Sequence, residues 1–254
     1  MQNSTLPALI GMLLRERPEL RTDIPESPSE QFRIYRSLVN VRPANPASAE
    51  FFEAEDAFLT AAAAQKGITD WHDLTPAEPG ILLWQGDITT LRCGAIVNAA
   101  NSGMTGCWSP CHSCIDNCIH TFAGVRLRLE CDRLMRAQGH PEPTGQAKLT
   151  PAYNLPCDYV IHTVGPIVDG ALTERHRELL RSCYEKCLSC AVENGIDSIA
   201  FCCISTGVFG FPKRPAAQIA VDTVRNFRKN HEISVIFNVF TDDDLAVYSQ
   251  ILNG

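Results

Sequence analysis

The sequence contains no apolar segment of the length that a membrane span requires, about 18 residues or more. Its opening segment, MQNSTLPALIGMLLRERPEL, lacks a basic region before the apolar run, and charged residues interrupt that run at positions 15–17, unlike in a signal peptide. Positive charge is also scarce, because 22 Lys and Arg residues face 29 Asp and Glu residues. These absences predict a cytoplasmic protein with neither a membrane nor a nucleic acid as its main partner.

The chain nevertheless has 12 cysteines. Because no export signal is found, reduced thiols or metal ligands are expected rather than disulfides. At 254 residues with 45% hydrophobic content, the chain is long enough for one large domain or a domain with an appendage. A net charge of −7 leaves room for one small bound anion, which backbone N–H groups can hold.

The chain has two regions with different patterns of apolar residues. Apolar residues at helical spacing in 6–16 and 47–67 predict a helical extension over residues 1–75, and Gly67 is a plausible helix end. A proline-bearing segment, 74–80, separates it from a region of alternating strands and helices. That alternation predicts an α/β domain with a mostly parallel sheet covered on both faces. The expected strands are 81–87, 95–101, 147–155, 159–165, 198–205 and 234–240, and the expected helices are 115–139, 174–195, 215–230 and 242–252.

Ligands bind beyond the carboxyl ends of such strands, so two loops are of interest. The first, MTGCWSPCHSCIDNCIH (104–120), allows several interpretations. Cys107, Cys111 and Cys114 have the spacing of a radical-SAM iron–sulfur motif, and the last two alone match half a structural zinc site or a redox pair. Cys107, His112 and Cys114 form a three-ligand set that leaves one zinc position open, as catalytic zinc sites require.

A second cysteine triplet shows that spacing alone is a weak signal. Cys183, Cys187 and Cys190 repeat the iron–sulfur spacing inside a strong helix, where they share one apolar face and are expected to be core residues. By the same helical phase, Cys118 is expected in the core, and His120 is expected to be a structural histidine with satisfied nitrogens.

The second loop, STGVFGFP (205–212), follows a strand and precedes a helix. Its glycines and hydroxyls suit a phosphate cradle, although an ordinary tight turn fits equally well. Acidic and amide side chains follow neighbouring strands at the same edge of the sheet and would suit a nucleotide with an attached sugar, or could be turn-formers and caps. These side chains are Asp87, Asn98 and Asn101, and Asp116 lies just past Cys114 in the first loop.

Five ordered segments together resemble a macrodomain, the α/β module that binds ADP-ribose: GDIT, IVNAANSGMTG, CIDNCIHTFAG, PTGQAKLTPAYNLPCDYVIHTVGP and ISTGVFGFP. The resemblance implies a three-layer α/β/α fold with a mostly parallel mixed sheet over residues 76–254, following the extension. Where hydrolytic macrodomains carry a glycine-rich run, this chain has CWSPCHSC, which is similar to the zinc-containing subgroup. That subgroup implies Zn²⁺ held by Cys107, His112 and Cys114.

The resemblance also assigns the other site residues. It places Asp116 and Asn101 at catalytic positions, with Asn98 and Asn101 near the distal ribose. Asp87 and Ile88 would hold the adenine end, which Phe240 would flank. The diphosphate and distal ribose would be wrapped by Ser205, Thr206, Gly207, Val208, Phe209 and Gly210.

The implied activity is zinc-dependent hydrolysis that removes ADP-ribose from modified protein side chains, with an oxygen linkage expected. The implied partners are ADP-ribose and mono-ADP-ribosylated protein, and a monomer is expected. One alternative is a non-catalytic reader of ADP-ribose with structural zinc, although structural sites usually have four protein ligands. Another is an iron–sulfur enzyme, which elemental analysis would separate from a zinc protein.

Overall fold

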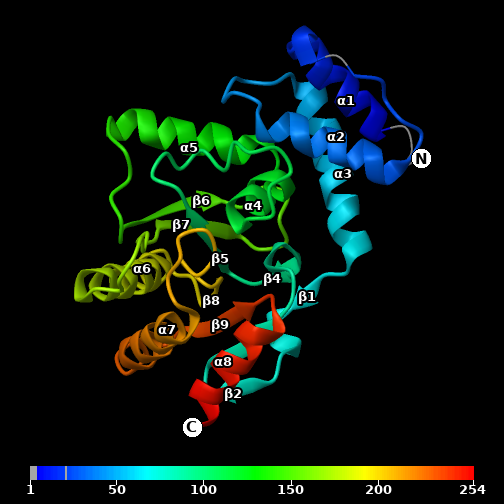
Figure 1. Cartoon of the computed structure of the whole chain (residues 1–254). Helices are drawn as coiled ribbons and strands as arrows, with labels where there is room; N and C mark the ends of the chain where they lie inside the picture. Colours follow the sequence, from blue (N-terminus) through cyan, green and yellow to red (C-terminus); the bar gives the residue numbers. More distant parts are fainter. Residues whose placement is uncertain (1–4, 21) are drawn as a thin grey trace.

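A mixed sheet lies at the centre of the computed structural model, which describes residues 5–20 and 22–254 (Figure 1). The strand order across this sheet is β2-β3-β9-β8-β5-β7-β6, with β2 and β6 antiparallel at the two edges and parallel pairing between the strands inside. Its strands are β2 (Pro76–Glu78), β3 (Ile81–Gln85), β5 (Ala95–Ala100), β6 (Ala147–Pro151), β7 (Tyr159–Val164), β8 (Ser198–Phe201) and β9 (Ser234–Val239).

Helices cover both faces of this sheet. One layer holds α4 (Ile115–Ala123) and α5 (Val125–Gln138), and the other holds α6 (Glu174–Glu193), α7 (Lys213–Arg228) and α8 (Asp242–Asn253) (Figure 1). Parallel strands covered on both faces are apolar throughout, as Ile96, Ile161 and Ile199 illustrate by being fully buried. The predicted three-layer α/β/α class is confirmed.

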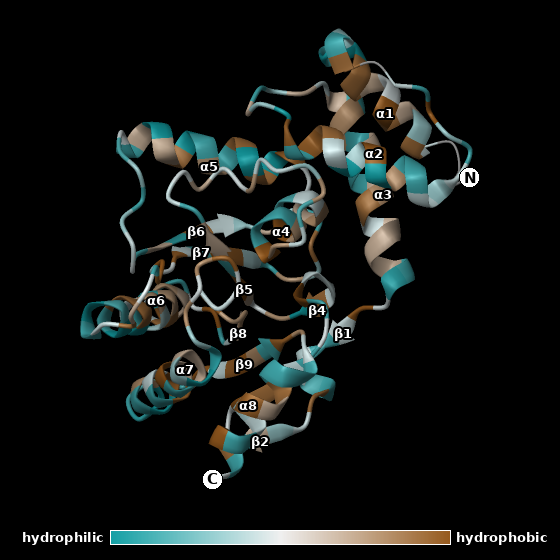
Figure 2. Cartoon of the chain, viewed as in Figure 1, coloured by the Kyte–Doolittle hydropathy of each residue, from teal (hydrophilic) through white to brown (hydrophobic). Residues whose placement is uncertain are grey.

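The N-terminal extension is helical and has its own apolar core. It consists of α1 (Thr5–Glu16), the short 3₁₀ turn η2 (Pro18–Leu20), α2 (Pro28–Asn40) and α3 (Ala49–Lys66). Each of the helices α1, α2 and α3 carries brown apolar segments in Figure 2. The cluster that they form also includes Val125 and Phe122 of the α/β domain, so the extension packs against that domain.

A short two-stranded sheet joins the two parts. β1 (Thr69–Asp70) pairs in parallel with β4 (Leu91–Arg92), and the 3₁₀ turns η3 (Trp71–Asp73) and η4 (Ile88–Thr90) lie nearby in the sequence. The boundary between residues 75 and 76 stays a prediction. Residues 1–4 and 21 of the predicted extension lie outside the described residues. Within the described ranges, no helix has the length and apolar character needed to cross a membrane.

Four predicted element boundaries were wrong, and one of them belongs to the strand expected over 147–155, which ends at Pro151. The single helix over 115–139 is two helices, because Gly124 adopts φ 89° and ψ 175°, a conformation essentially restricted to glycine. A Cβ there would lie 2.7 Å from Oε2 of Glu55 in α3, so the break follows a tertiary contact. The strand expected over 198–205 ends at Phe201, and the separating segment 74–80 contains edge strand β2.

Candidate functional site

The carboxyl ends of the parallel strands gather most of the predicted site residues at one edge of the sheet. Asp87 follows β3, Asn101 follows β5, the 205–210 loop follows β8, and Phe240 follows β9. Asp116 reaches the same edge from the first turn of α4, which begins after the loop leaving β5. The residues of this loop, 101–114, are called the metal loop below.

Asp116 is a buried carboxyl that two amides hold. The amide of Asn98 donates to its Oδ1 (2.8 Å), and that of Asn101 donates to its Oδ2 (3.2 Å). Burial raises the pKa of Asp116 to about 6, although the Asn98 bond, the Arg128 charge and the Asn101 bond each lower it. Asn101 also donates to the carbonyl of Gly106 (3.0 Å), so one side chain links this carboxyl to the metal loop.

Beneath Asp116 lies a buried cluster of His120, Cys131 and His162, whose ligand-type atoms lie within 4.8 Å of one another. Asn98 donates to Nδ1 of His162 (3.1 Å), and Nε2 of His162 lies 2.9 Å from Oγ1 of Thr150. Burial lowers the pKa of His162 to about 3 and that of His120 well below its usual value, so both rings are neutral at pH 7.

His120 differs from the prediction. Neither of its ring nitrogens has a hydrogen-bond partner among the described residues, so the expectation of a satisfied structural histidine was wrong. Its Nε2 lies 3.6 Å from Oδ1 of Asp116, beyond hydrogen-bond length. Sequence reasoning missed Cys131 and His162, although His162 stands in a strand whose neighbours are all apolar or small.

Cys107, His112 and Cys114 converge in the metal loop, with their ligand atoms within 4.8 Å of one another. All three are half-buried. Burial, together with the neighbouring Cys107 thiol, raises the pKa of Cys114 to about 12, although a backbone hydrogen bond from Asn117 lowers it. A cation between these groups would relieve that cost by stabilising the thiolates. Two thiols and an imidazole are the donor set that zinc prefers, so the residues present fit this metal.

The other cysteines lie outside this trio. Cys111 and Cys118 are half-buried, and Sγ of Cys118 lies 3.4 Å from the guanidinium of Arg36, so the prediction of a core position for Cys118 was wrong. Cys183 and Cys187 are fully buried, which confirms the predicted core position for these two, whereas Cys190 is half-buried and packs against the core.

The loop after β8 forms a tight turn with several free backbone N–H groups. Gly210 donates to the carbonyl of Gly207 (3.0 Å), which closes a tight turn. In the described parts of the chain, the backbone N–H groups of Gly207, Val208 and Phe209 donate to no protein acceptor. Successive free N–H groups of this kind form concavities that bind anions. The side chain of Val208 is 79% exposed at this loop.

The first residue of this loop has a strained backbone conformation and a hydroxyl without a hydrogen-bond partner in the described structure. Ser205 adopts φ 66°, a left-handed conformation that is rare outside glycine and asparagine. Its hydroxyl is buried without a partner in the described structure. Thr206 instead donates its hydroxyl to the carbonyl of Cys203 (3.0 Å), so it shapes the turn.

The opposite end of the site holds Asp87, Ile88 and Phe240. Burial raises the pKa of Asp87, but hydrogen bonds from Lys66 (2.8 Å) and Thr89 outweigh this effect and leave the pKa below its usual value. Ile88 is buried in the main core, whereas Phe240 is 75% exposed. The predicted contacts of all three with a nucleotide stay predictions.

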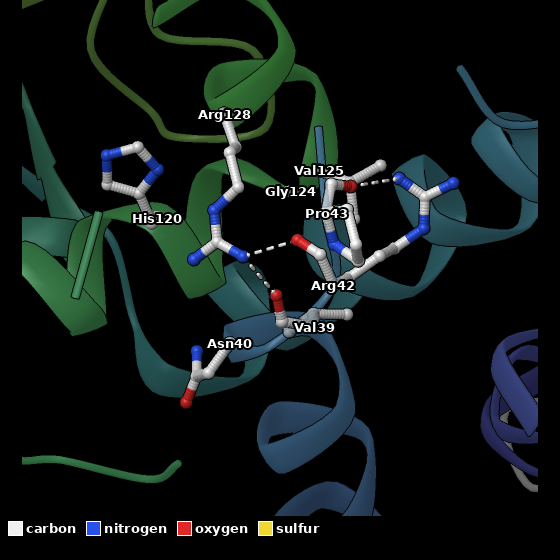
Figure 3. Close-up of a pocket in the computed structure, with 8 residues that line it drawn as sticks. All are labelled: Val39, Asn40, Arg42, Pro43, His120, Gly124, Val125 and Arg128. Carbon is white, nitrogen blue, oxygen red and sulfur yellow. Dashed lines mark hydrogen bonds between the residues drawn. The ribbon is translucent and has the colours of Figure 1, made fainter. Parts of the chain in front are cut away.

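Arg128, which no sequence motif singles out, contacts several parts of the structure. It is 5% exposed, and its Nη1 donates to the carbonyls of Val39 (2.9 Å) and Arg42 (2.8 Å), as Figure 3 shows. Its Nε donates to the carbonyl of Thr105 (2.7 Å), and its guanidinium lies 4.3 Å from the ring centroid of Trp108. These contacts join α5, the end of α2 and the metal loop, and Arg128 also lines a cavity of about 10 Å³ together with Val39 and His120.

A turn with free backbone N–H groups and a buried carboxyl lie together at the carboxyl edge of a parallel sheet, the edge at which α/β domains bind ligands. A family model described as the Macro domain matches residues 97–220. A Treponema medium protein named protein-ADP-ribose hydrolase is 54% identical over 252 residues, covering 96% of this chain and 97% of that protein. A Staphylococcus aureus protein of the same name is 47% identical, covering 98% of this chain and 95% of that protein.

Solved structures agree with these sequence relatives. The Trypanosoma brucei macrodomain in complex with ADP-ribose has a TM-score of 0.64 at 32% identity and covers 88% of this chain and 95% of its own. The Oceanobacillus iheyensis macrodomain with ADP has a TM-score of 0.63 at 34% identity and covers 68% of this chain and 90% of its own. The chain belongs to the macrodomain family.

Proposed function

We propose that this protein is a zinc-dependent hydrolase that removes ADP-ribose from modified protein side chains, with the ADP-ribose joined through oxygen. The observation that carries the proposal is the adjacency of two sites. Cys114, one of the three candidate metal ligands, precedes α4, and the buried carboxyl Asp116 lies in the first turn of that helix. Two relatives that match nearly this whole chain are named protein-ADP-ribose hydrolase, which supports the reaction class.

The chain would bind the substrate from both ends. The free N–H groups of Gly207, Val208 and Phe209 would donate to the diphosphate, since backbone donors bind anions without a net positive protein. Asp87 would accept from the exocyclic amine of adenine, and the exposed ring of Phe240 would stack on the base. These contacts would present the distal ribose to Asp116 and the metal loop.

The hydrolytic step then needs a base and charge stabilisation. Asp116 would accept a proton from the attacking water, while Asn98 and Asn101 fix its orientation. Zinc held by Cys107, His112 and Cys114 would supply a Lewis acid beside the bond that breaks. The buried His120 and His162, both neutral, would keep the floor of this site free of a competing positive charge.

The test of this function is a panel of proteins carrying ADP-ribose on Asp, Glu, Ser or Arg. Release of free ADP-ribose is followed by mass spectrometry at equal enzyme concentration. Release from oxygen-linked substrates but not from the nitrogen-linked Arg substrate is expected. Tight binding of free ADP-ribose without release from any substrate would instead establish a reader module, which is the alternative interpretation.

A further inference from the structure

The metal loop is strained where it carries the candidate ligands. Cys111 adopts φ 55°, a left-handed conformation that a side chain other than glycine occupies at a cost of about 1–2 kcal/mol. It lies between Cys107 and His112 in the sequence, immediately before the latter. Such strained residues persist only where the surroundings hold them in place.

Asn40, the last residue of α2, supplies one of these constraints. Its Oδ1 accepts a hydrogen bond from the backbone N–H of Cys111 (2.9 Å), and its Nδ2 donates to Oγ1 of Thr121 in α4 (3.0 Å). Asn40 is buried, so water does not compete for either bond. The N-terminal extension therefore fixes the strained residue through a side chain that uses both of its polar atoms.

Arg36, one turn earlier in α2, supplies the second constraint. Its Nη2 donates to the carbonyl of His112 (2.7 Å) and, together with Nε, to Oδ1 of Asn117 in α4 (2.8 and 3.1 Å). Asn117 in turn donates to the carbonyl of Ser109 (3.0 Å). One guanidinium thus connects the backbone of a candidate metal ligand to the helix that carries Asp116.

We propose that Arg36 and Asn40 of the N-terminal extension are positioning residues of the metal site. They hold the metal loop in the strained geometry that brings Cys107, His112 and Cys114 together. This inference rests on the proposed function, because it takes the metal at those three residues as the zinc of the hydrolase. It assigns the extension a role in metal retention beyond packing on the α/β domain.

The experiment compares Arg36→Met with Arg126→Met. Both variants remove an arginine contact between the extension and the α/β domain, since Arg126 of α5 donates to Asp56 of α3 (2.6 Å). Of these two arginines, only Arg36 contacts the metal loop among the described residues, so Arg126→Met controls for general loosening of the extension. The readouts are the transfer rate of zinc to a coloured chelator, the thermal midpoint, kcat, and the Kd for ADP-ribose.

We expect Arg36→Met to release zinc about 10–100-fold faster than the unaltered protein, the usual effect of removing a partner that orients metal ligands. At limiting zinc, the kcat of Arg36→Met should fall together with its zinc content. Arg126→Met should release zinc at the same rate as the unaltered protein. Should Arg36→Met not fold, Arg36→Lys serves instead. An ammonium cannot reproduce the two bonds that the guanidinium makes to Oδ1 of Asn117 together with the bond to the His112 carbonyl, so faster zinc release is again expected.

Zinc release from the Arg36 variant no faster than from Arg126→Met would overturn this inference alone. Purified, unaltered protein that holds no zinc would overturn the proposed function, and the inference with it. Equal acceleration in both variants would show that the extension acts only through general stability, which also contradicts a positioning role.

Discussion

Glu55 makes the junction between the extension and the α/β domain sensitive to pH. It lies in α3 with 1% exposure, accepts from the Tyr35 hydroxyl at Oε1 (2.7 Å), and accepts from the N–H of Val125 at Oε2 (2.9 Å). Burial raises the pKa of Glu55 from 4.5 to about 7, even though both hydrogen bonds and the charge of Arg42 lower it. The shift corresponds to about 3 kcal/mol of pH-dependent stability.

Whether the free energy of unfolding rises or falls with pH depends on which state, folded or unfolded, loses the Glu55 proton first. Below pH 4.5 the carboxyl is protonated in both states, and its full contribution to stability is present. As the pH rises toward about 7, the unfolded chain loses its proton first, so the free energy of unfolding falls. Above pH 7 both states are ionised, and the loss is complete.

The prediction is tested by urea unfolding of the unaltered protein and Glu55→Gln at pH 4.5, 6, 7 and 8, with zinc content held equal. The difference in unfolding free energy between the unaltered protein and Glu55→Gln should change by about 3 kcal/mol across this range. Other titrating groups such as Asp116 contribute equally to both proteins, so their effects cancel in this difference. Tyr35→Phe should enlarge the pH-dependent loss, since it removes a bond to the ionised carboxyl. A difference that is independent of pH would refute the reasoning.

Three further predictions concern single substitutions. Gly124→Ala should lower the free energy of unfolding by about 1–3 kcal/mol, measured by urea unfolding, because only glycine adopts this backbone conformation beside Glu55. Asp116→Asn should lower kcat by at least about 100-fold while calorimetry gives an unaltered Kd for ADP-ribose, and an unaltered kcat would remove Asp116 from the mechanism. Phe240→Ala should weaken ADP-ribose binding by about 10-fold through loss of stacking, whereas an unaltered Kd would place the base elsewhere.

The layers of the fold could be predicted because the signals are local. Continuous apolar runs such as AIVNAAN mark parallel strands, and helical periodicity marks the segments between them. The break at Gly124 could not be predicted, since a glycine is tolerated within an amphipathic helix. What decides its conformation there is Glu55, almost 70 residues away in the sequence.

The candidate site also has a part that the sequence predicts and a part that it does not. Cys107, His112 and Cys114 are close in sequence, so their convergence was accessible from spacing together with the resemblance. The contacts of Arg36 and Asn40 with the metal loop span more than 70 residues and leave no periodic pattern. The unpaired nitrogens of His120 depend on what faces a buried ring, which helical phase alone does not determine.

The most direct test of the account measures zinc per chain and ADP-ribose release on the same samples of Cys107→Ala, Cys114→Ala and a Cys118→Ala control. Circular dichroism verifies folding, because loss of a metal can also unfold its loop. The account predicts that the first two variants lose zinc and activity together, while the control, whose thiol lies outside the trio, retains both. Full ADP-ribose release by a folded, zinc-free Cys107→Ala or Cys114→Ala protein would contradict it.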